Sequence, residues 1–271
     1  MELEGIGFDY DRAPKSGRRT LNGVSFSVPK GQAVGLIGQS GSGKSTLAKI
    51  VLGLAKPSDG VIRFDGKPID EHGLQSFRRR VQPIFQNPMD ALDPRMRIGD
   101  QLLEPLLVNF RLSRCERQER VETALASVRL SREIAGKLPR QISGGQAQRV
   151  TIARALLLDP ELLICDEPVS ALDMTVQAQI LNLLNELRAE RRLTLLFISH
   201  DIRAISYLCS EIVVLHKGCV VEAGSRESVL LRSSDEYTRT LLASVPNKGR
   251  RAFSARGQDE ESFTAERVAS H

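Results

Sequence analysis

The sequence predicts an α/β fold with a mainly parallel central sheet, an N-terminal antiparallel β part and a helical subdomain insert. Three observations support this prediction. Short apolar runs of strand length, such as residues 33–37 and 195–198, alternate with amphipathic stretches of helical spacing. The first 37 residues are typical of short strands with turns, and residues 24–28 alternate apolar and polar positions as a half-buried strand does. Residues 89–140 instead carry long charged stretches with apolar residues at helical intervals.

Residues 38–46 fit the phosphate-binding pattern G-x-x-x-x-G-K-[ST], between an apolar strand and a helical pattern, as the motif requires. Its glycines let the backbone curl so that successive N–H groups point at an anion. Lys44 adds a positive charge, and the hydroxyl of Ser45 suits Mg²⁺, which prefers oxygen ligands. The predicted nucleotide-binding residues are Gly38, Gln39, Ser40, Gly41, Ser42, Gly43, Lys44, Ser45 and Thr46. The predicted apolar face of the next helix consists of Leu47, Ile50, Val51 and Leu54. The fold class is therefore that of a phosphate-loop NTPase.

The composition is that of an ordinary soluble domain, with 41% hydrophobic and 26% charged residues. No apolar run approaches the roughly 20 residues that span a bilayer, and the acidic N-terminus does not look like a secretory signal. The net charge of +5 is spread along the chain and aromatic residues make up 4%, which does not favour nucleic-acid binding. The four cysteines lack C-x-x-C spacing, so we expect buried, reduced thiols.

Turn and strand signals continue after the loop. Residues 61–70 predict a strand pair that turns at Asp65 and Gly66. Residues 81–85 predict a further strand, and Pro83, which lacks a backbone N–H, favours an edge position or a short ladder for that strand. Because strands and helices alternate, we expect functional sites at the carboxyl ends of parallel strands.

A helical insert is predicted over about residues 89–157. Ser143 is placed as the N-cap of its last helix, where Ser143, Gly144, Gly145 and Gln146 make a second glycine-rich helix start able to bind an anion. With two phosphate-binding elements in one chain, one of them can complete the nucleotide site of a second molecule. From residue 247 the chain turns polar, so we expect a domain over residues 1–246 and a flexible tail over residues 247–271.

Acidic and polar residues follow three of the predicted strands. Asp166 ends an apolar run, where its carboxylate can hold Mg²⁺. Glu167 comes next and is expected to point elsewhere along the pleat, placed to take a proton from an attacking water. His200 can hydrogen-bond a γ-phosphate or that water, and Gln86 can ligate Mg²⁺ and orient water through its amide.

In this order, the motifs resemble those of the nucleotide-binding subunits of ATP-binding cassette (ABC) transporters, over about residues 3–245. The resemblance identifies Gln86 as the Q-loop glutamine, His200 as the switch histidine and Tyr10 as the aromatic residue that stacks on adenine. It identifies residues 143–146 as the signature that covers a partner's nucleotide. It also identifies a D-loop made of Ser170, Ala171, Leu172 and Asp173.

The resemblance implies hydrolysis of ATP with Mg²⁺ at the cytoplasmic face of the cell membrane. The implied catalytic residues are Glu167, His200 and Gln86, and the implied metal ligands are Ser45, Gln86 and Asp166. The implied partners are a second ABC ATPase subunit, expected to be a related but non-identical chain, two transmembrane permease subunits and an extracytoplasmic solute-binding protein. Ile142 departs from the leucine that usually begins the family signature, but it keeps an apolar side chain.

A narrower resemblance, to the ATPases of peptide and nickel importers, rests on residues 86–96, 104–106 and 236–246. The group usually has His-Pro immediately before Tyr237, where this chain has Asp-Glu. Many oligopeptide members carry a cysteine cluster beyond this helix, whereas no cysteine follows Cys219 here. This leaves dipeptides, nickel or metal chelates, and opine-like solutes open.

Three alternatives belong to other classes. A non-transport ABC ATPase, such as a phosphonate-metabolism component, would be recovered without a membrane subunit. A small kinase with the same loop would make a phosphorylated product, but it gives no reason for residues 143–146, residues 170–173 and His200 in that order. A pseudo-ATPase would bind nucleotide without turnover, which the presence of Glu167 and His200 disfavours.

Overall fold

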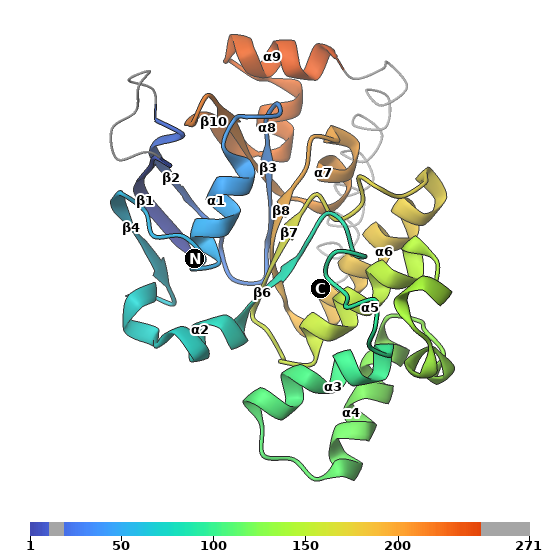
Figure 1. Cartoon of the computed structure of the whole chain (residues 1–271). Coiled ribbons are helices and arrows are strands. Elements are labelled where there is room, and N and C mark those ends of the chain that lie inside the picture. The colour runs from blue at the N-terminus through green and yellow to red at the C-terminus, as the bar shows by residue number, and fades with distance from the viewer. Residues whose placement is uncertain (11–18, 245–271) are drawn as a thin grey trace, which may run out of the picture.

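The computed structural model describes residues 1–10 and 19–244, and its strands form two sheets (Figure 1). The larger sheet has six strands in the order β10-β9-β3-β8-β7-β6. These strands are β3 (Ala33–Ile37), β6 (Val81–Ile84), β7 (Leu162–Asp166), β8 (Thr194–Ile198), β9 (Glu211–His216) and β10 (Cys219–Ser225). Neighbours run parallel except for the antiparallel pair of β9 and β10, which confirms the predicted mainly parallel sheet.

The smaller sheet is antiparallel and has the order β2-β1-β4-β5. Its strands are β1 (Glu2–Phe8), β2 (Leu21–Ser27), β4 (Asp59–Phe64) and β5 (Lys67–Pro68). The chain turns between β4 and β5 at Asp65 and Gly66, which both have positive φ angles, of 56° and 76°. The predicted N-terminal antiparallel part and its turn are therefore confirmed.

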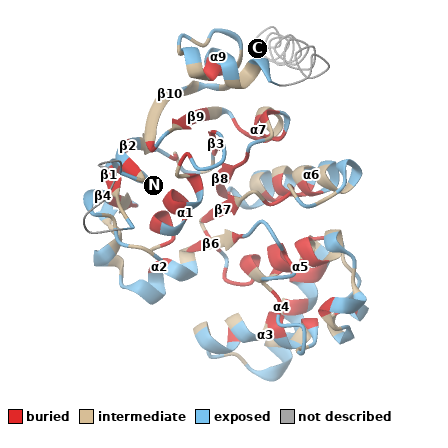
Figure 2. Cartoon of the chain, turned by 45° about the horizontal axis from the view of Figure 1, so that its top comes forward, coloured by how far each residue is buried: buried red, intermediate tan, exposed pale blue. Residues whose placement is uncertain are grey.

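The helices cover both faces of the larger sheet and extend from one end of it (Figures 1 and 2). The α-helices are α1 (Lys44–Val51), α2 (Leu74–Arg80), α3 (Ile98–Asn109), α4 (Arg114–Ser127), α5 (Gly144–Leu156), α6 (Met174–Arg191), α7 (Ile202–Leu208), α8 (Arg226–Leu231) and α9 (Glu236–Ala243). Short 3-10 helices span Ile69–His72, Arg132–Gly136 and Pro139–Gln141. Helices α3 to α5 lie between β6 and β7 in the chain, where the helical insert was predicted.

The core divides according to the two faces of the larger sheet. Successive side chains of a strand point to opposite faces. In β8, Leu195 and Phe197 therefore pack with the helices of the insert and with α6 and α7, whereas Leu196 and Ile198 pack with α1 and the smaller sheet. Helix α1 thus lies between the two sheets, which fixes the direction of the loop that precedes it.

Strand β6 lies at the edge of the larger sheet, as Pro83 predicted. Two expectations about packing were wrong. Leu54 does not lie on the face of α1, because that helix ends at Val51 and Gly53 takes up a φ angle of 64° that redirects the chain, leaving Leu54 56% exposed. The cysteines are all free thiols but are not all buried, since Cys115 is exposed and Cys219 half-buried.

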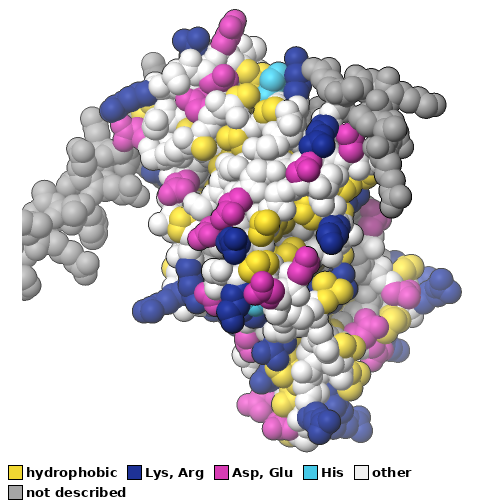
Figure 3. Space-filling view, turned by 90° about the vertical axis from the view of Figure 1, so that its left-hand side faces the viewer, with side chains coloured by type: hydrophobic (Ala, Val, Ile, Leu, Met, Phe, Trp, Pro, Cys, Tyr) yellow, Lys and Arg dark blue, Asp and Glu magenta, His cyan; other side chains and the backbone are white. Residues whose placement is uncertain are grey.

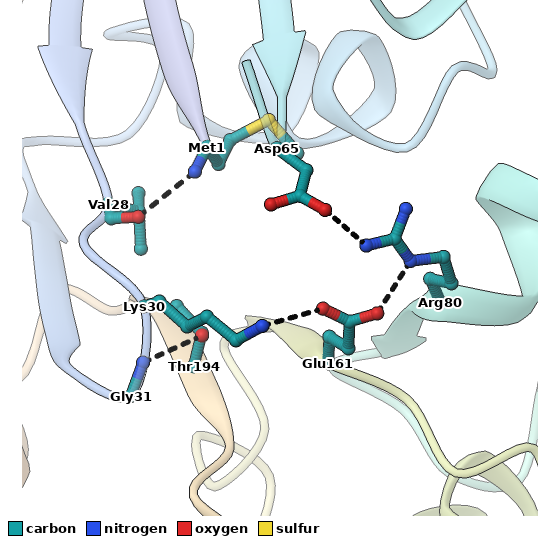
Figure 4. A network of polar contacts seen from close by, with 8 residues as sticks. All are labelled: Met1, Val28, Lys30, Gly31, Asp65, Arg80, Glu161 and Thr194. Atoms are coloured by element: carbon teal, nitrogen blue, oxygen red, sulfur yellow. Dashed lines mark hydrogen bonds and ion pairs between the residues drawn. The ribbon is translucent and has the colours of Figure 1, made fainter. Parts of the chain in front are cut away.

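An ion-pair cluster joins the two sheets near the amino ends of the parallel strands (Figure 4). The Arg80 guanidinium donates to Asp65 at 2.9 Å and to Glu161 at 2.6 Å, and Lys30 donates to Glu161 at 3.3 Å. The guanidinium also stacks 4.6 Å from the centroid of the Phe64 ring. The hydrogen bonds from Arg80 lower the pKa values of both carboxyls. Arg80 thus links the turn of the smaller sheet to the segment that begins β7.

Side chains of both charges are mixed over the face that carries the smaller sheet (Figure 3). Among the helices of residues 1–10 and 19–244, none combines the length and apolar character needed to cross a bilayer. The tail predicted at residues 247–271 lies outside the described residues.

Candidate functional site

The topology gathers the phosphate loop, the Asp166–Glu167 pair, His200 and Gln86 at one edge of the larger sheet, whereas Tyr10 follows a strand of the smaller sheet and residues 143–146 begin α5. The phosphate loop follows β3, His200 follows β8, the Asp166–Glu167 pair ends β7, and Gln86 follows β6. These strands are consecutive neighbours in the order β3-β8-β7-β6 and run parallel. Their carboxyl ends therefore meet at the same edge, where sites of open α/β sheets form.

The ammonium group of Lys44 is folded back into the phosphate loop. Its Nζ donates to the carbonyl oxygens of Gly38 at 2.7 Å and Gln39 at 2.9 Å, and the residue is only 6% exposed. Burial lowers the pKa of Lys44, and the nearby charges of Glu167 and Asp166 oppose that shift. The loop thus holds a cation beside a curl of backbone, which is the arrangement expected of a phosphate site.

Two glycines of the loop occupy positions that no larger residue fits. A Cβ on Gly38 would lie 2.2 Å from the carbonyl oxygen of Leu215. Gly43 has a φ angle of 105°, and its Cβ would lie 2.7 Å from Leu21 Cδ2. A Cβ on Gly41, by contrast, would meet open space, which leaves that side of the loop accessible.

The carboxylate of Asp166 lies beside the hydroxyl of Ser45. Burial raises the pKa of Asp166, and the hydrogen bond from Ser45 opposes the shift. Its Oδ1 is buried and has no hydrogen-bond partner within the described residues. A buried carboxylate oxygen without a partner, next to a hydroxyl, is an oxygen set that fits a hard cation such as Mg²⁺.

Glu167 lies just beyond the end of β7 and faces His200. Its Oε2 is 3.2 Å from Nδ1 of His200, and its backbone nitrogen donates to the carbonyl oxygen of Ile198 at 2.9 Å. The backbone of Glu167 has a φ angle of 50°. The expectation that the strand pleat directs Glu167 was therefore wrong, because a left-handed residue sets its direction instead.

Tyr10 and Gln86 both lie at the surface. Tyr10 is 65% exposed, its hydroxyl is 3.1 Å from Oγ1 of Thr46, and its ring meets Phe8 edge-on at 5.0 Å. This contact places an accessible aromatic ring at the helix that follows the phosphate loop. Gln86 is exposed in the segment after β6.

The second glycine-rich segment begins α5 as predicted. Ser143 Oγ accepts from the Gln146 nitrogen at 3.2 Å, and Gln146 Oε1 accepts from the Ser143 nitrogen at 3.0 Å, which makes a capping box. A Cβ on Gly145 would lie 2.6 Å from Val176 Cγ1, so this glycine allows α5 to approach α6 closely.

Residues 170–173 connect Glu167 to α6. Ser170 Oγ donates to the carbonyl oxygen of Glu167 at 3.1 Å, and Asp173 caps α6 by accepting from the nitrogens of Thr175 and Val176 at 3.0 Å. Leu172 lies 3.5 Å from the position of a Cβ on Gly144. The segment of residues 170–173 thus lies between the carboxylate pair and the glycine-rich helix start, with Ala171 in its turn.

Gln101 of α3 is a residue that the sequence interpretation missed. It is 2% exposed, its Nε2 donates to the carbonyl oxygens of Asp93 and Met96 at 3.0 and 2.9 Å, and its Oε1 accepts from the Asp93 nitrogen at 2.8 Å. Gln101 therefore shapes the loop that follows Gln86. The sequence feature that could have indicated this role is the amide side chain of Gln101 beside the apolar positions of its helix, next to Leu102.

Comparisons with known proteins agree with this geometry. The profile of the ABC transporter family matches residues 21–170. A peptide import ATP-binding protein of Brucella ovis is 43% identical over 84% of this chain and 73% of its own length. The dipeptide transport ATP-binding protein DppF of Escherichia coli is 39% identical over 86% of this chain and 71% of its own.

Solved structures show the same fold. CbiO1 of Clostridium perfringens, part of the ABC transporter complex cbiONQ, superposes with a TM-score of 0.76 and 30% identity over 93% of this chain and 97% of its own. A dimeric ATP-binding cassette in a post-hydrolysis state, bound to ADP and Pi, gives a TM-score of 0.74 and 31% identity over 83% of this chain and 98% of its own. The chain belongs to the ABC transporter family and is one of its ATPases.

Proposed function

We propose that the chain is the ATP-hydrolysing subunit of an importer that carries small peptides across the cytoplasmic membrane, at whose inner face it works as a peripheral subunit. The observation that carries the proposal is the meeting of the phosphate loop with Asp166, Glu167 and His200 at one sheet edge. The relatives of Brucella ovis and Escherichia coli are named as peptide import and dipeptide transport ATP-binding proteins, which supports a peptide solute rather than nickel or a metal chelate.

The phosphate loop would bind the nucleotide. The start of α1 would offer free backbone N–H groups to the phosphates, and Lys44 would turn from the Gly38 carbonyl to the outer phosphates. Tyr10, which is accessible beside Thr46, would stack on the adenine ring. Ser45 and Asp166 would hold Mg²⁺, with Gln86 as a further ligand. When bound, the cation neutralises part of the charge on the phosphates.

Glu167 would act as general base on the water that attacks the γ-phosphate. A base must lie within hydrogen-bond reach of the proton that it removes, and Glu167 projects from the strand end next to the loop. His200 is held 3.2 Å from that carboxylate and would bind the γ-phosphate or the water. The proton would pass from the water to Glu167 as phosphate leaves.

The site would be completed by a second ATPase subunit, which we expect to be related but not identical. Residues 143–146 would cover the nucleotide of that partner, and the partner's equivalent segment would cover the nucleotide held by Lys44. Two permease subunits would contact the helical insert, residues 89–157, and the segment after Gln86. A solute-binding protein outside the membrane would deliver the peptide, and nucleic acid would play no part.

The experiment is purification of the tagged chain from membranes of its native cell, followed by identification of co-purifying proteins and an ATPase assay with added peptides. We expect two membrane proteins, a second ABC ATPase and stimulation of phosphate release by peptide. Recovery without a membrane protein would favour an ABC ATPase outside transport. Stimulation by nickel but not by any peptide would overturn the proposed solute.

A further inference from the structure

The last described helix reaches the phosphate loop. The hydroxyl of Tyr237 in α9 lies 3.0 Å from the backbone nitrogen of Gln39 and accepts its hydrogen bond, across 198 residues of sequence. The Tyr237 ring stacks on the imidazole of His216 at the end of β9, with ring centroids 3.7 Å apart and planes tilted by 31°. The chemistry of hydrolysis described above does not use this contact.

The contact acts on the peptide group that also holds Lys44. The carbonyl of Gly38 and the N–H of Gln39 belong to one planar trans peptide group, so they point in opposite directions. The carbonyl accepts from Lys44 Nζ at 2.7 Å, and the N–H donates to Tyr237 at 3.0 Å. Tyr237 and Lys44 therefore hold opposite edges of the same plane, and rotation of that plane would break both hydrogen bonds.

The segment that leads into α9 is hydrogen-bonded to β10, and the start of α9 is capped and partly buried. Glu222 of β10 accepts from the Ser233 hydroxyl at 2.6 Å and from the Ser234 nitrogen at 3.1 Å. Asp235 caps α9 by accepting from the nitrogen of Thr238 at 2.8 Å, and Thr238 is fully buried. The hydroxyl of Tyr237 thus projects from a fixed position.

The opposite side of the loop is attached in a similar way. The Gly218 nitrogen, in the turn between β9 and β10, donates to the carbonyl oxygen of Ser42 at 3.0 Å. Gln39 is exposed, so water would satisfy its N–H if the tyrosine hydroxyl were absent. The Tyr237 hydroxyl also fixes the orientation of the Gly38–Gln39 peptide plane, because it projects from a fixed helix, whereas a water molecule bound to the same N–H would not fix that orientation.

We propose that Tyr237 is a positioning residue of the ATPase: by holding the Gly38–Gln39 peptide plane, it keeps the backbone of the loop in the conformation that receives the phosphates, toward which Lys44 then turns. The inference rests on the proposed role of Lys44 in binding nucleotide. It gives α9 a direct influence on nucleotide affinity, although α9 itself touches neither phosphate nor water in the proposed reaction.

The test is the affinity of the full-length chain for MgADP, measured by isothermal titration calorimetry on Tyr237→Phe. This variant keeps the ring against His216 and removes only the hydroxyl. Loss of one hydrogen bond predicts a rise in Kd of about twofold to tenfold. The matched control is Tyr207→Phe, which removes a hydroxyl bonded to Asn182 and is expected to leave the Kd unchanged.

A second variant tests the same hydrogen bond from the other side. Gln39→Pro removes the backbone N–H that donates to Tyr237, and an unchanged unfolding temperature of this variant checks that the loop accepts proline. If both substitutions act through one bond, the double variant binds MgADP no more weakly than the weaker single variant. Additive losses would show two separate effects and overturn the proposal.

Lys44→Ala separates this inference from the proposed function. If Lys44→Ala weakens binding and Tyr237→Phe binds like the unchanged chain, Tyr237 is only a packing residue and the inference is overturned. If Lys44→Ala itself binds like the unchanged chain, the proposed nucleotide site is wrong. If Tyr237→Phe binds MgADP more weakly but unfolds at an unchanged temperature, Tyr237 is a positioning residue. A general loss of structure would lower both the affinity and the unfolding temperature.

Discussion

The carboxylate of Glu167 and the imidazole of His200 meet across the neighbouring parallel strands β7 and β8, with Oε2 3.2 Å from Nδ1. Glu167 is largely buried in this contact, whereas the side chain of His200 is 61% exposed. The carboxylate of Glu167 is therefore shielded from solvent beside the strand ends, whereas the imidazole of His200 is accessible to a ligand or to a second subunit.

His200 is expected to contribute to turnover more than to binding. In the proposed reaction, replacing it with alanine would remove one donor from the γ-phosphate, which is expected to lower kcat roughly 10²- to 10³-fold. The Kd for ATP is expected to change far less, because Lys44 and the loop remain. Steady-state phosphate release and equilibrium titration measure the two quantities. A variant with unchanged kcat would remove His200 from the reaction.

Asp166→Asn is expected to stabilise the chain when nucleotide and Mg²⁺ are absent. Burial raises the pKa of Asp166, so the native state binds the proton more tightly than the unfolded chain. The free energy of unfolding therefore falls as the pH rises from 3.8, the ordinary pKa of an Asp carboxyl, toward the raised pKa of Asp166, because the carboxyl must ionise while buried. The asparagine removes this charge.

Thermal unfolding at neutral pH should show a higher midpoint for Asp166→Asn, together with loss of the further stabilisation that MgATP gives the unchanged chain. The gain should vanish at a pH below 3.8, where the carboxyl is protonated in both states. A lower midpoint at neutral pH would contradict the role of burial at this residue.

Arg80→Ala is expected to loosen the attachment of the smaller sheet. It removes the contacts with Glu161 and Phe64, with a loss of about 1–2 kcal/mol in the free energy of unfolding and of about 2–5 °C in the midpoint. The control is Arg95→Ala, whose side chain is 92% exposed and lies 4.0 Å from Asp93.

The Arg80 contact also predicts a dependence on pH. The hydrogen bond from Arg80 lowers the pKa of Glu161 below the ordinary pKa of 4.5. The bond therefore stabilises the fold fully above pH 4.5, and this stabilisation is lost as the pH falls through the lowered pKa. Acid unfolding of Arg80→Ala should therefore show a smaller loss of stability over this range. Equal losses in both proteins would show that the ion pair contributes nothing.

Gln101→Leu is expected to make the loop that follows Gln86 more mobile. The substitution keeps the volume but leaves two carbonyls and one N–H of Asp93 and Met96 without their partner, a loss of about 1–3 kcal/mol. Limited proteolysis should cut within residues 90–97 faster than in the unchanged chain. Gln118→Leu, at an exposed position of α4, is the control, and equal rates of cleavage in all three proteins would refute this role.

The sequence allowed prediction of features that depend on residue chemistry close along the chain. Pro83 lacks a donor, which places β6 at an edge, and Ser143 with Gln146 makes a capping box of short range. The left-handed backbone of Glu167 could not be predicted, because glutamate has no local preference for it. The contact of Gln39 with Tyr237 depends on the path of the whole chain, so neither residue alone indicates it.

The most direct test of the account is phosphate release by Glu167→Gln in a single turnover of MgATP. The amide keeps the shape of the side chain but cannot accept the proton, so the rate should fall by roughly 10²- to 10⁴-fold. Binding of MgATP should be retained, and Glu186→Gln, at an exposed position of α6, should release phosphate at the unchanged rate. Hydrolysis by Glu167→Gln at the rate of the unchanged chain would contradict the assignment of Glu167 as the general base.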